Sequence, residues 1–272
     1  MYKHLRPFLL FMFIILLAAG CSKQGSFSTT DKSILLTNST FESAAREFLS
    51  PSELEVIRLS EPGTCPGHFD IQPKHAAAAM LRTSLIVRFK FQESLDSKVG
   101  TNKKIKVIDN VEGLCKPSTY ISICEKMGDI FVEENWISPE YKDLKLQQIS
   151  QRLDSLSNEL KKQIEDAGLS NIPVLTSPHQ KLFCEWLGLN VIGTFNSSES
   201  ASALEIFNSY KQAHHSNISY VIANQPEGTQ LAQMLADKTN SKLAVFGNFP
   251  QLKSNLPFDE LLRNNVKCLL TQ

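Results

Sequence analysis

The sequence has no surplus of either charge and no hydrophobic run long enough to cross a bilayer as a permanent helix. Its 272 residues carry 28 Lys and Arg against 28 Asp and Glu. No basic stripe is present that could neutralise nucleic-acid phosphates. The apolar run at residues 8–19 is about a dozen residues long, whereas a transmembrane helix needs about 20. Nucleic acid is therefore not an expected partner, and the run at residues 8–19 is not expected to span a membrane.

Cysteine is scarce, and no two cysteines have the CxxC spacing of a zinc knuckle, so cysteine is a weak candidate for metal binding. Outside the cytoplasm, pairs of cysteines oxidise to disulfides. Cys115 and Cys124 bracket a predicted loop and are our first expectation for such a bridge. An odd number of cysteines follows Cys21, which leaves at least one free or paired between molecules. The pairing is otherwise open among Cys65, Cys115, Cys124, Cys184 and Cys268.

The N-terminus has the three parts of a secretory signal peptide. Lys3 and Arg6 form a basic start, the apolar run follows, and small residues precede Cys21. The segment 17–21, LAAGC, resembles a bacterial lipobox, in which the cysteine becomes the lipidated first residue; the alternative is an ordinary signal peptide with a chance cysteine. We expect residues 1–20 to be removed and residues 21–32 to form a lipidated, flexible tether. The protein would then be exported and lipid-anchored in the periplasm or at the cell surface.

The remaining chain alternates short apolar runs with amphipathic stretches. Strands that alternate with helices predict parallel βαβ units and an α/β fold. The predicted strands are 33–37, 54–59, 84–89, 104–108, 173–176, 191–194, 219–223 and 243–246. The predicted helices are 41–48, 74–81, 180–187, 201–213, 228–239 and one that begins at 257.

One longer helix is predicted between these two series of strands. Apolar residues recur at steps of three and four from Ile149 to Ile164, with charged and polar residues between them. A helix over residues 139–167 would be about 40 Å long, enough to reach from one lobe to another. We therefore predict two α/β lobes with parallel sheets flanked by helices, joined by a single long linking helix. The predicted boundaries are 33–138 for the N-terminal lobe, 139–168 for the helix and 169–272 for the C-terminal lobe.

Ligands of open α/β sheets bind in the loops that follow the strands, so polar residues at these places are candidate site residues. His68 lies in a loop rich in Gly and Pro after the second strand, and His179 directly follows the fifth. Imidazole binds zinc, copper, iron and nickel, although each histidine could instead have only a local structural role. Glu134 and Trp136 precede the long helix. Acidic residues are favoured there by the helix dipole alone, and Trp136 fits either the core or the wall of a cleft.

These segments resemble the metal-binding family of ABC transporter solute-binding lipoproteins, which capture zinc, manganese or iron. The family has a His-containing loop after its second strand, which here reads HFDIQP at 68–73. Its His-x-Trp signature before a helix appears as ENWISP at 134–139, with Glu134 at the position of the histidine. Its Thr-Ser-His segment, which enters a helix that ends in Gly-Leu, appears as TSPH at 176–179 with Gly-Leu at 188–189.

The resemblance implies a metal site built by His68, Glu134 and His179, with Asn248, Asp70 or water completing it and Trp136 as a wall of the cleft. A carboxylate in place of imidazole shifts such a site toward harder ions such as manganese. The family's last ligand is a carboxylate after the final strand, whereas this sequence has Asn248 there.

The expected function is capture of a divalent metal ion, zinc or manganese or else iron, by a monomer that delivers it to the permease and ATPase subunits of an ABC importer. Two histidines and a carboxylate also describe catalytic zinc, but no HExxH motif supplies a general base, so we do not expect an enzyme. One alternative is a protein of the same fold that binds a corrinoid, haem or siderophore. Another is a surface adhesin or metal chaperone.

Overall fold

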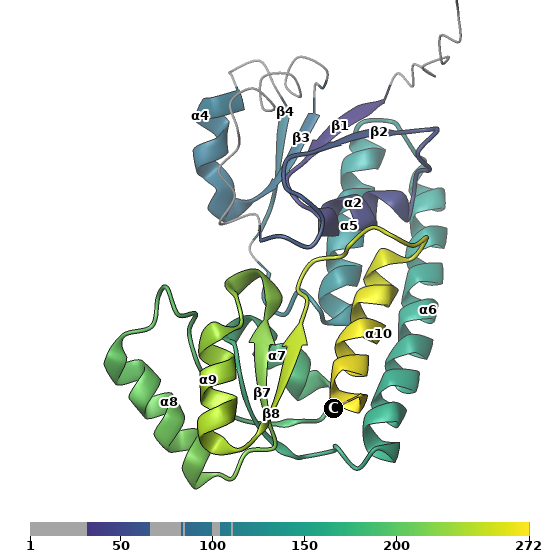
Figure 1. Cartoon of the computed structure of the whole chain (residues 1–272). Helices are drawn as coiled ribbons and strands as arrows, with labels where there is room; N and C mark the ends of the chain where they lie inside the picture. The colour runs from purple at the N-terminus through teal and green to yellow at the C-terminus, as the bar shows by residue number, and fades with distance from the viewer. Residues whose placement is uncertain (1–31, 66–82, 84, 100–103, 110, 272) are drawn as a thin grey trace, which may run out of the picture.

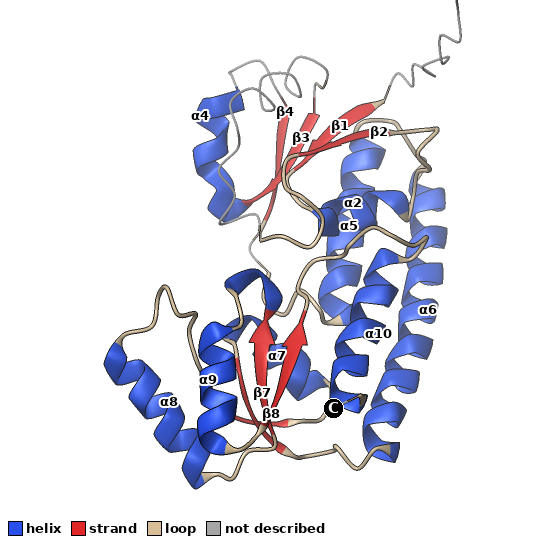
Figure 2. Ribbon diagram, viewed as in Figure 1, coloured by secondary structure: helices blue, strands red, loops and turns tan. Residues whose placement is uncertain are grey.

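The computed structural model describes residues 32–65, 83, 85–99, 104–109 and 111–271 and shows two α/β lobes, one above the other (Figures 1 and 2). Each lobe contains a four-stranded parallel sheet with helices on its faces. The structure confirms the predicted fold class. The signal peptide, Cys21, His68, Asp70 and the predicted helix at 74–81 lie outside the described residues. In the part of the chain that is described, no helix combines the length and the apolar character that a membrane span requires.

The sheet of the N-terminal lobe has the strand order β2-β1-β3-β4. Its strands are β1 (Ser33–Leu36), β2 (Glu55–Arg58), β3 (Leu85–Phe89) and β4 (Lys104–Ile108). All neighbouring strands are parallel. β3 is buried at every position, as expected for a parallel strand covered on both faces.

Helices α2 (Ser39–Arg46) and α5 (Pro117–Glu133) cover one face of this sheet, and their buried residues share a core with Ile34 and Val87. The Asn38 side chain caps α2 by accepting a hydrogen bond from the backbone N–H of Phe41 at 3.0 Å. The opposite face packs against the short helix η1 (Lys90–Leu95), whose Leu95 belongs to a separate small apolar cluster, and α4 (Asp96–Val99) follows η1 directly.

The sheet of the C-terminal lobe repeats this topology with the order β6-β5-β7-β8. The strands are β5 (Pro173–Thr176), β6 (Asn190–Thr194), β7 (Tyr220–Asn224) and β8 (Lys242–Phe246). Their neighbours are again parallel. In Figure 1 the arrowheads of β7 and β8 point toward the upper, N-terminal lobe, so the carboxyl ends of these strands face the junction between the lobes.

Two pairs of helices sandwich the sheet of the C-terminal lobe. Buried residues of α8 (Ala203–His215) and α9 (Gln230–Thr239) form one apolar layer with Leu175 and Val221. Buried residues of α7 (Pro178–Trp186) and α10 (Pro257–Leu270) form the other. A short helix, η2 (Gln225–Glu227), connects β7 to the turn before α9.

The long helix α6 (Pro139–Asp166) runs alongside both lobes (Figure 1). Ser138 caps it by accepting from the N–H of Tyr141, and Pro139 occupies the first helical turn, where no N–H is needed. Its buried stripe is the one that the sequence predicts: Ile149, Leu153, Leu156, Leu160 and Ile164. The helix packs against α5 of one lobe and α10 of the other, so its stripe belongs to a core that continues through both lobes.

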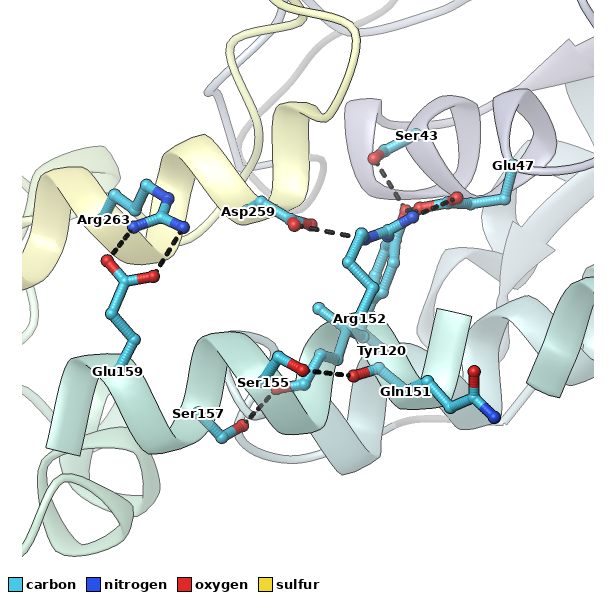
Figure 3. A network of polar contacts seen from close by, with 11 residues as sticks. Ser43, Glu47, Tyr120, Gln151, Arg152, Ser155, Ser157, Glu159, Asp259 and Arg263 are labelled. Atoms are coloured by element: carbon cyan, nitrogen blue, oxygen red, sulfur yellow. Dashed lines mark hydrogen bonds and ion pairs between the residues drawn. The ribbon is translucent and has the colours of Figure 1, made fainter. Parts of the chain in front are cut away.

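A polar network lies within this three-helix contact (Figure 3). Arg152 of α6 donates two hydrogen bonds to Glu47, which follows α2, at 3.0 and 2.6 Å. The Nε atom of Arg152 lies 3.1 Å from Oδ2 of Asp259 on α10. Burial raises the pKa of Asp259, while the charge of Arg152 opposes that shift. Beside the network, the rings of Tyr120 and Phe258 stack with centroids 3.8 Å apart, so α5 and α10 are also in direct contact.

The interpretation of residues 115–124 as a loop closed by a disulfide was wrong. Residues 117–133 form α5, whose buried side is Tyr120, Ile123, Cys124, Met127, Ile130 and Phe131. Cys115 and Cys124 are both unpaired, as are Cys65, Cys184 and Cys268. Cys124 points into the core from the helix, and its thiol replaces an apolar side chain there.

Candidate binding cleft between the lobes

The carboxyl ends of the strands in both sheets border one cleft of about 610 Å³. Phe89, Phe91 and the segment 111–114 line it from the N-terminal lobe. The start of α7 and residues that follow β7 and β8 line it from the C-terminal lobe. Ligand sites of doubly wound sheets lie at this edge, in the crevice where the strand order reverses.

In the C-terminal lobe this reversal falls between β5 and β7. The chain leaves β5 for β6 on one side, then crosses to β7 and continues outward to β8. The loops after β5 and β7 therefore diverge, and a crevice opens between them. His179 follows β5 and Glu227 follows β7, so adjacent strands deliver these two side chains to the same place.

His179 and Glu227 are close enough to act on one ligand. His179 Nε2 lies 3.3 Å from Glu227 Oε1. The other carboxylate oxygen, Oε2, accepts a hydrogen bond of 2.6 Å from the hydroxyl of Ser177. The histidine side chain is 57% exposed and the glutamate side chain 16%. The imidazole is therefore accessible from the cleft, while the carboxylate is largely buried and hydrogen-bonded to Ser177.

The local sequence explains why His179 points into the cleft. Ser177 is the N-cap of α7 and accepts a hydrogen bond from the backbone N–H of His179 at 3.3 Å. Pro178 occupies the first turn, where its fixed φ favours the helix start. His179 is thus fixed on the first turn of a helix that begins immediately at the end of β5.

The floor of the cleft is a buried polar layer that joins the lobes. Asn248 lines the cleft, and its Oδ1 lies 3.6 Å from the thiol sulfur of Cys115 in the other lobe. The same sulfur lies 3.3 Å from the carbonyl oxygen of Gly247. Asn265 of α10 holds Gly247 through both its N–H and its carbonyl, at 2.8 and 3.0 Å. Burial, together with the nearby Cys184, raises the pKa of Cys115, so the thiol stays protonated and acts as a hydrogen-bond donor.

The structure does not bring Glu134 to His179. Glu134 is the C-cap of α5 and forms an ion pair with Lys104 at the first residue of β4. Because α5 starts beside the cleft and has 17 residues, its far end lies about 25 Å away. Trp136 packs on Phe131 with ring centroids 5.3 Å apart and against the core, and it is not among the residues that line this cleft.

Of the predicted site residues, His179 and Asn248 both line the cleft. His68 and Asp70 lie outside the described residues, although Cys65, three positions before His68, also lines the cleft. Among the residues that the structure does describe, no group of three or more His, Cys, Asp or Glu side chains is arranged to hold a metal ion. The metal site as a whole therefore stays a prediction.

The sequence analysis missed two carboxylates of the cleft, Glu112 and Glu227. Glu112 follows β4, and Glu227 follows β7 within a short turn that ends at Gly228. Both occupy the place after a strand at which we sought ligands. Neither glutamate belongs to a motif that carries the resemblance, whose expected carboxylate ligand, Glu134, precedes the long helix instead.

Comparison with solved structures identifies the fold. A cadmium-bound periplasmic metal-binding protein from Candidatus Liberibacter asiaticus matches with a TM-score of 0.72 and 16% identity. A manganese-bound structure from the same organism matches with a TM-score of 0.71 and 15% identity. A structure of ZnuA matches with a TM-score of 0.70 and 13% identity. Each match covers 88% of this chain and 98% of the other.

No protein-family model matches the sequence, and no curated protein matches it either. At identities of 13–16% the likeness to solved structures concerns the fold. One of the Candidatus Liberibacter asiaticus structures holds cadmium and the other manganese. The chain therefore has the two-lobed α/β fold of these periplasmic metal-binding proteins, as the resemblance of its sequence predicted.

Proposed function

We propose that this protein is an exported, lipid-anchored capture protein that binds a divalent transition metal ion, zinc or manganese, and hands it to an ABC importer. The observation that carries the proposal is the position of His179, which is exposed in the cleft at the strand-order reversal with a carboxylate 3.3 Å away. Imidazole and carboxylate together are typical ligands of zinc, and carboxylate also suits manganese. The metal is cargo in this proposal, taken up and released intact.

His68 is the ligand that we propose from the N-terminal lobe. Cys65 lines the cleft, and three residues of extended chain span at most about 11 Å, so the imidazole of His68 is within reach of the cleft. Glu112 is exposed on the same side and offers a carboxylate. A site completed from both lobes would explain why the C-terminal lobe alone holds only part of a ligand set.

Isothermal titration of the metal-free protein with zinc, manganese and iron(II) tests this proposal. We expect micromolar or tighter binding of at least one of these ions, and weaker binding at acidic pH because the ligands must be deprotonated. His179→Ala should weaken binding at least tenfold. His215→Ala is the matched control, since His215 lies on α8, is not among the residues that line the cleft, and hydrogen-bonds through Nδ1 to the carbonyl of Lys211. Absence of binding by the unaltered protein contradicts the proposal.

Anchoring and delivery need separate tests. Cys21→Ala should move the protein from the membrane fraction to the soluble exported fraction, because the lipidated residue is lost. Cells that lack the protein should accumulate less of the metal at low external supply, and the intact gene should restore uptake only when the permease and ATPase are present. If metal uptake is unchanged in cells that lack the protein, the proposed role in transport is wrong, although the protein can still bind metal.

A second candidate function is favoured by the lining of the cleft. Phe89, Phe91 and Phe249 all border it, and its volume of about 610 Å³ is in the range of pockets for small organic ligands. Phe89 and Phe91 stack with centroids 5.4 Å apart, and Phe91 is exposed. A corrinoid, haem or siderophore would use these rings. Titration with haem and with a corrinoid, followed by absorbance, distinguishes this function: saturable spectral change without binding of free metal ions favours it.

A further inference from the structure

We propose that Glu227 is the carboxylate ligand of the metal site, bound together with His179 and oriented by Ser177. This inference rests on the proposed function and assigns the ligand role expected of Glu134 to a residue on the other lobe. Three observations carry it: the distance between the two donor atoms, the hydrogen bond behind the carboxylate, and the place of both residues in the sheet topology.

The distance between the donor atoms fits a shared ion. Nitrogen and oxygen ligands lie about 2.1 Å from zinc, and two such ligands at a tetrahedral angle are about 3.4 Å apart. His179 Nε2 and Glu227 Oε1 are 3.3 Å apart. Little side-chain movement is therefore needed for both atoms to contact one ion.

The carboxylate is already oriented from behind. Ser177 is buried, with 2% exposure, and donates to Glu227 Oε2 at 2.6 Å, which directs Oε1 to the histidine. Partners of this kind fix the orientation of metal ligands and raise affinity. Because Ser177 also caps the helix that carries His179, one serine positions both donors.

The backbone after β7 holds Glu227 in place. Glu227 ends η2, and Gly228 follows with a φ of 79°, a left-handed conformation that residues other than glycine rarely adopt. The turn leads the chain into α9, and the Glu227 side chain contacts Ser177 and His179, which follow β5, the strand beside β7 at the reversal of strand order. The competing explanation of the pair is an ion pair between a protonated His179 and Glu227 that has no role in metal binding.

Titration with zinc and the absorption spectrum of the cobalt(II)-loaded protein separate these explanations. Glu227→Gln should weaken zinc binding about 100-fold or more and should shift the cobalt absorption bands, because a ligand atom changes. Ser177→Ala should weaken binding about tenfold, as expected for loss of an orienting partner, and should leave the bands in place. Glu185→Gln is the matched control, since Glu185 lies on α7 and pairs with Lys181 instead of with His179. Its affinity and bands should be unchanged.

Glu227→Asp tests whether a change of side chain in this turn is enough to alter binding, because it keeps the carboxylate. We expect cobalt bands like those of the unaltered protein, at reduced affinity. If the unaltered protein binds zinc and Glu227→Gln binds it equally well, with unchanged cobalt bands, the inference is overturned while the proposed function stands. If the unaltered protein binds none of these metals, the proposed function and the inference fail together.

Discussion

At the scale of single residues, the cysteine thiols differ in how deeply they are buried. Cys115, Cys124 and Cys184 are buried, whereas Cys65 and Cys268 are half-buried. Burial raises the pKa of Cys184 to about 12 and that of Cys124 well above its usual value. Since the thiolate is the reactive form, buried thiols with raised pKa values are inert.

We expect a brief treatment of the native protein with iodoacetamide at pH 8 to modify Cys65 much faster than Cys115, Cys124 and Cys184. Peptide mass spectrometry measures the modified fraction of each cysteine. Saturating metal should slow the modification of Cys65, because it lines the cleft. Protein unfolded in urea is the control, in which all these thiols become accessible. Rapid modification of Cys124 in native protein would contradict the burial that the structure shows.

Residue types alone predicted only part of the candidate site. His179 was predicted because it follows a strand that the sequence marks clearly, and Asn248 because the resemblance implies a ligand after the final strand. Both line the cleft. Glu134 also stands next to a clear helix start, but the helix before it carries it to the far end of the lobe. A short motif cannot reveal where Glu134 lies, because that position depends on whether the residues before the motif form a long helix or a loop.

At the scale of elements, α6 forms two ion pairs with its neighbours, one through Arg152 and one through Glu159, in different surroundings (Figure 3). Arg152 projects from α6 toward Glu47 and Asp259, both of which are largely buried. On the more exposed side, Glu159 of α6 pairs with Arg263 of α10, with Nη2 and Oε2 2.9 Å apart. Removing one partner of a buried ion pair leaves an uncompensated charge, whereas exposed pairs contribute little.

Arg152→Ala should therefore lower the free energy of unfolding by about 3 kcal/mol, because Glu47 and Asp259 lose their cation. Arg263→Ala is the matched control and should cost less than about 1 kcal/mol. Urea unfolding followed by circular dichroism measures the free energy of unfolding of both variants. The slope of this free energy against urea concentration should stay unchanged. Equal costs for the two variants would show that the buried network does not stabilise the contact between the lobes.

The element that the sequence analysis overlooked, α5, had a clear signal. Tyr120, Cys124, Met127 and Phe131 recur at steps of three and four, and Pro117 marks a helix start. The expected loop and disulfide between Cys115 and Cys124 were incompatible with this helical spacing of apolar residues. The eight strands, by contrast, were predicted to within one or two residues of their observed ends, because runs of β-branched and apolar residues flanked by turn residues are a local signal.

At the scale of the whole molecule, the lobes share one apolar core. Residues of β1, α5, α6, β5 and α10 belong to the same cluster of buried side chains. The predicted lobe boundaries at residues 138 and 168 stay a prediction. Because the core is continuous, we do not expect the lobes to unfold separately. We expect a single cooperative transition in calorimetry, with equal calorimetric and van't Hoff enthalpies. Two resolved transitions would contradict this expectation.

The same contacts limit motion between the lobes. α6 packs against both α5 and α10, and the Cys115 thiol reaches the turn after β8 across the floor of the cleft. Loading should consist of a small adjustment and not a wide hinge closure. We expect the radius of gyration from X-ray scattering to be equal for metal-free and metal-loaded protein within error. A clear contraction on loading would contradict this picture.

The position of α10 has a consequence for biosynthesis. This helix follows every strand that the structure describes, yet it supplies Phe258, Leu262 and Val266 to the shared core and contacts α2 of the N-terminal lobe. Until these residues emerge from the ribosome, α2, α5 and α6 lack a neighbour against which they pack. A nascent chain can therefore complete the packing of these three helices only after residues 257–270 have been synthesised.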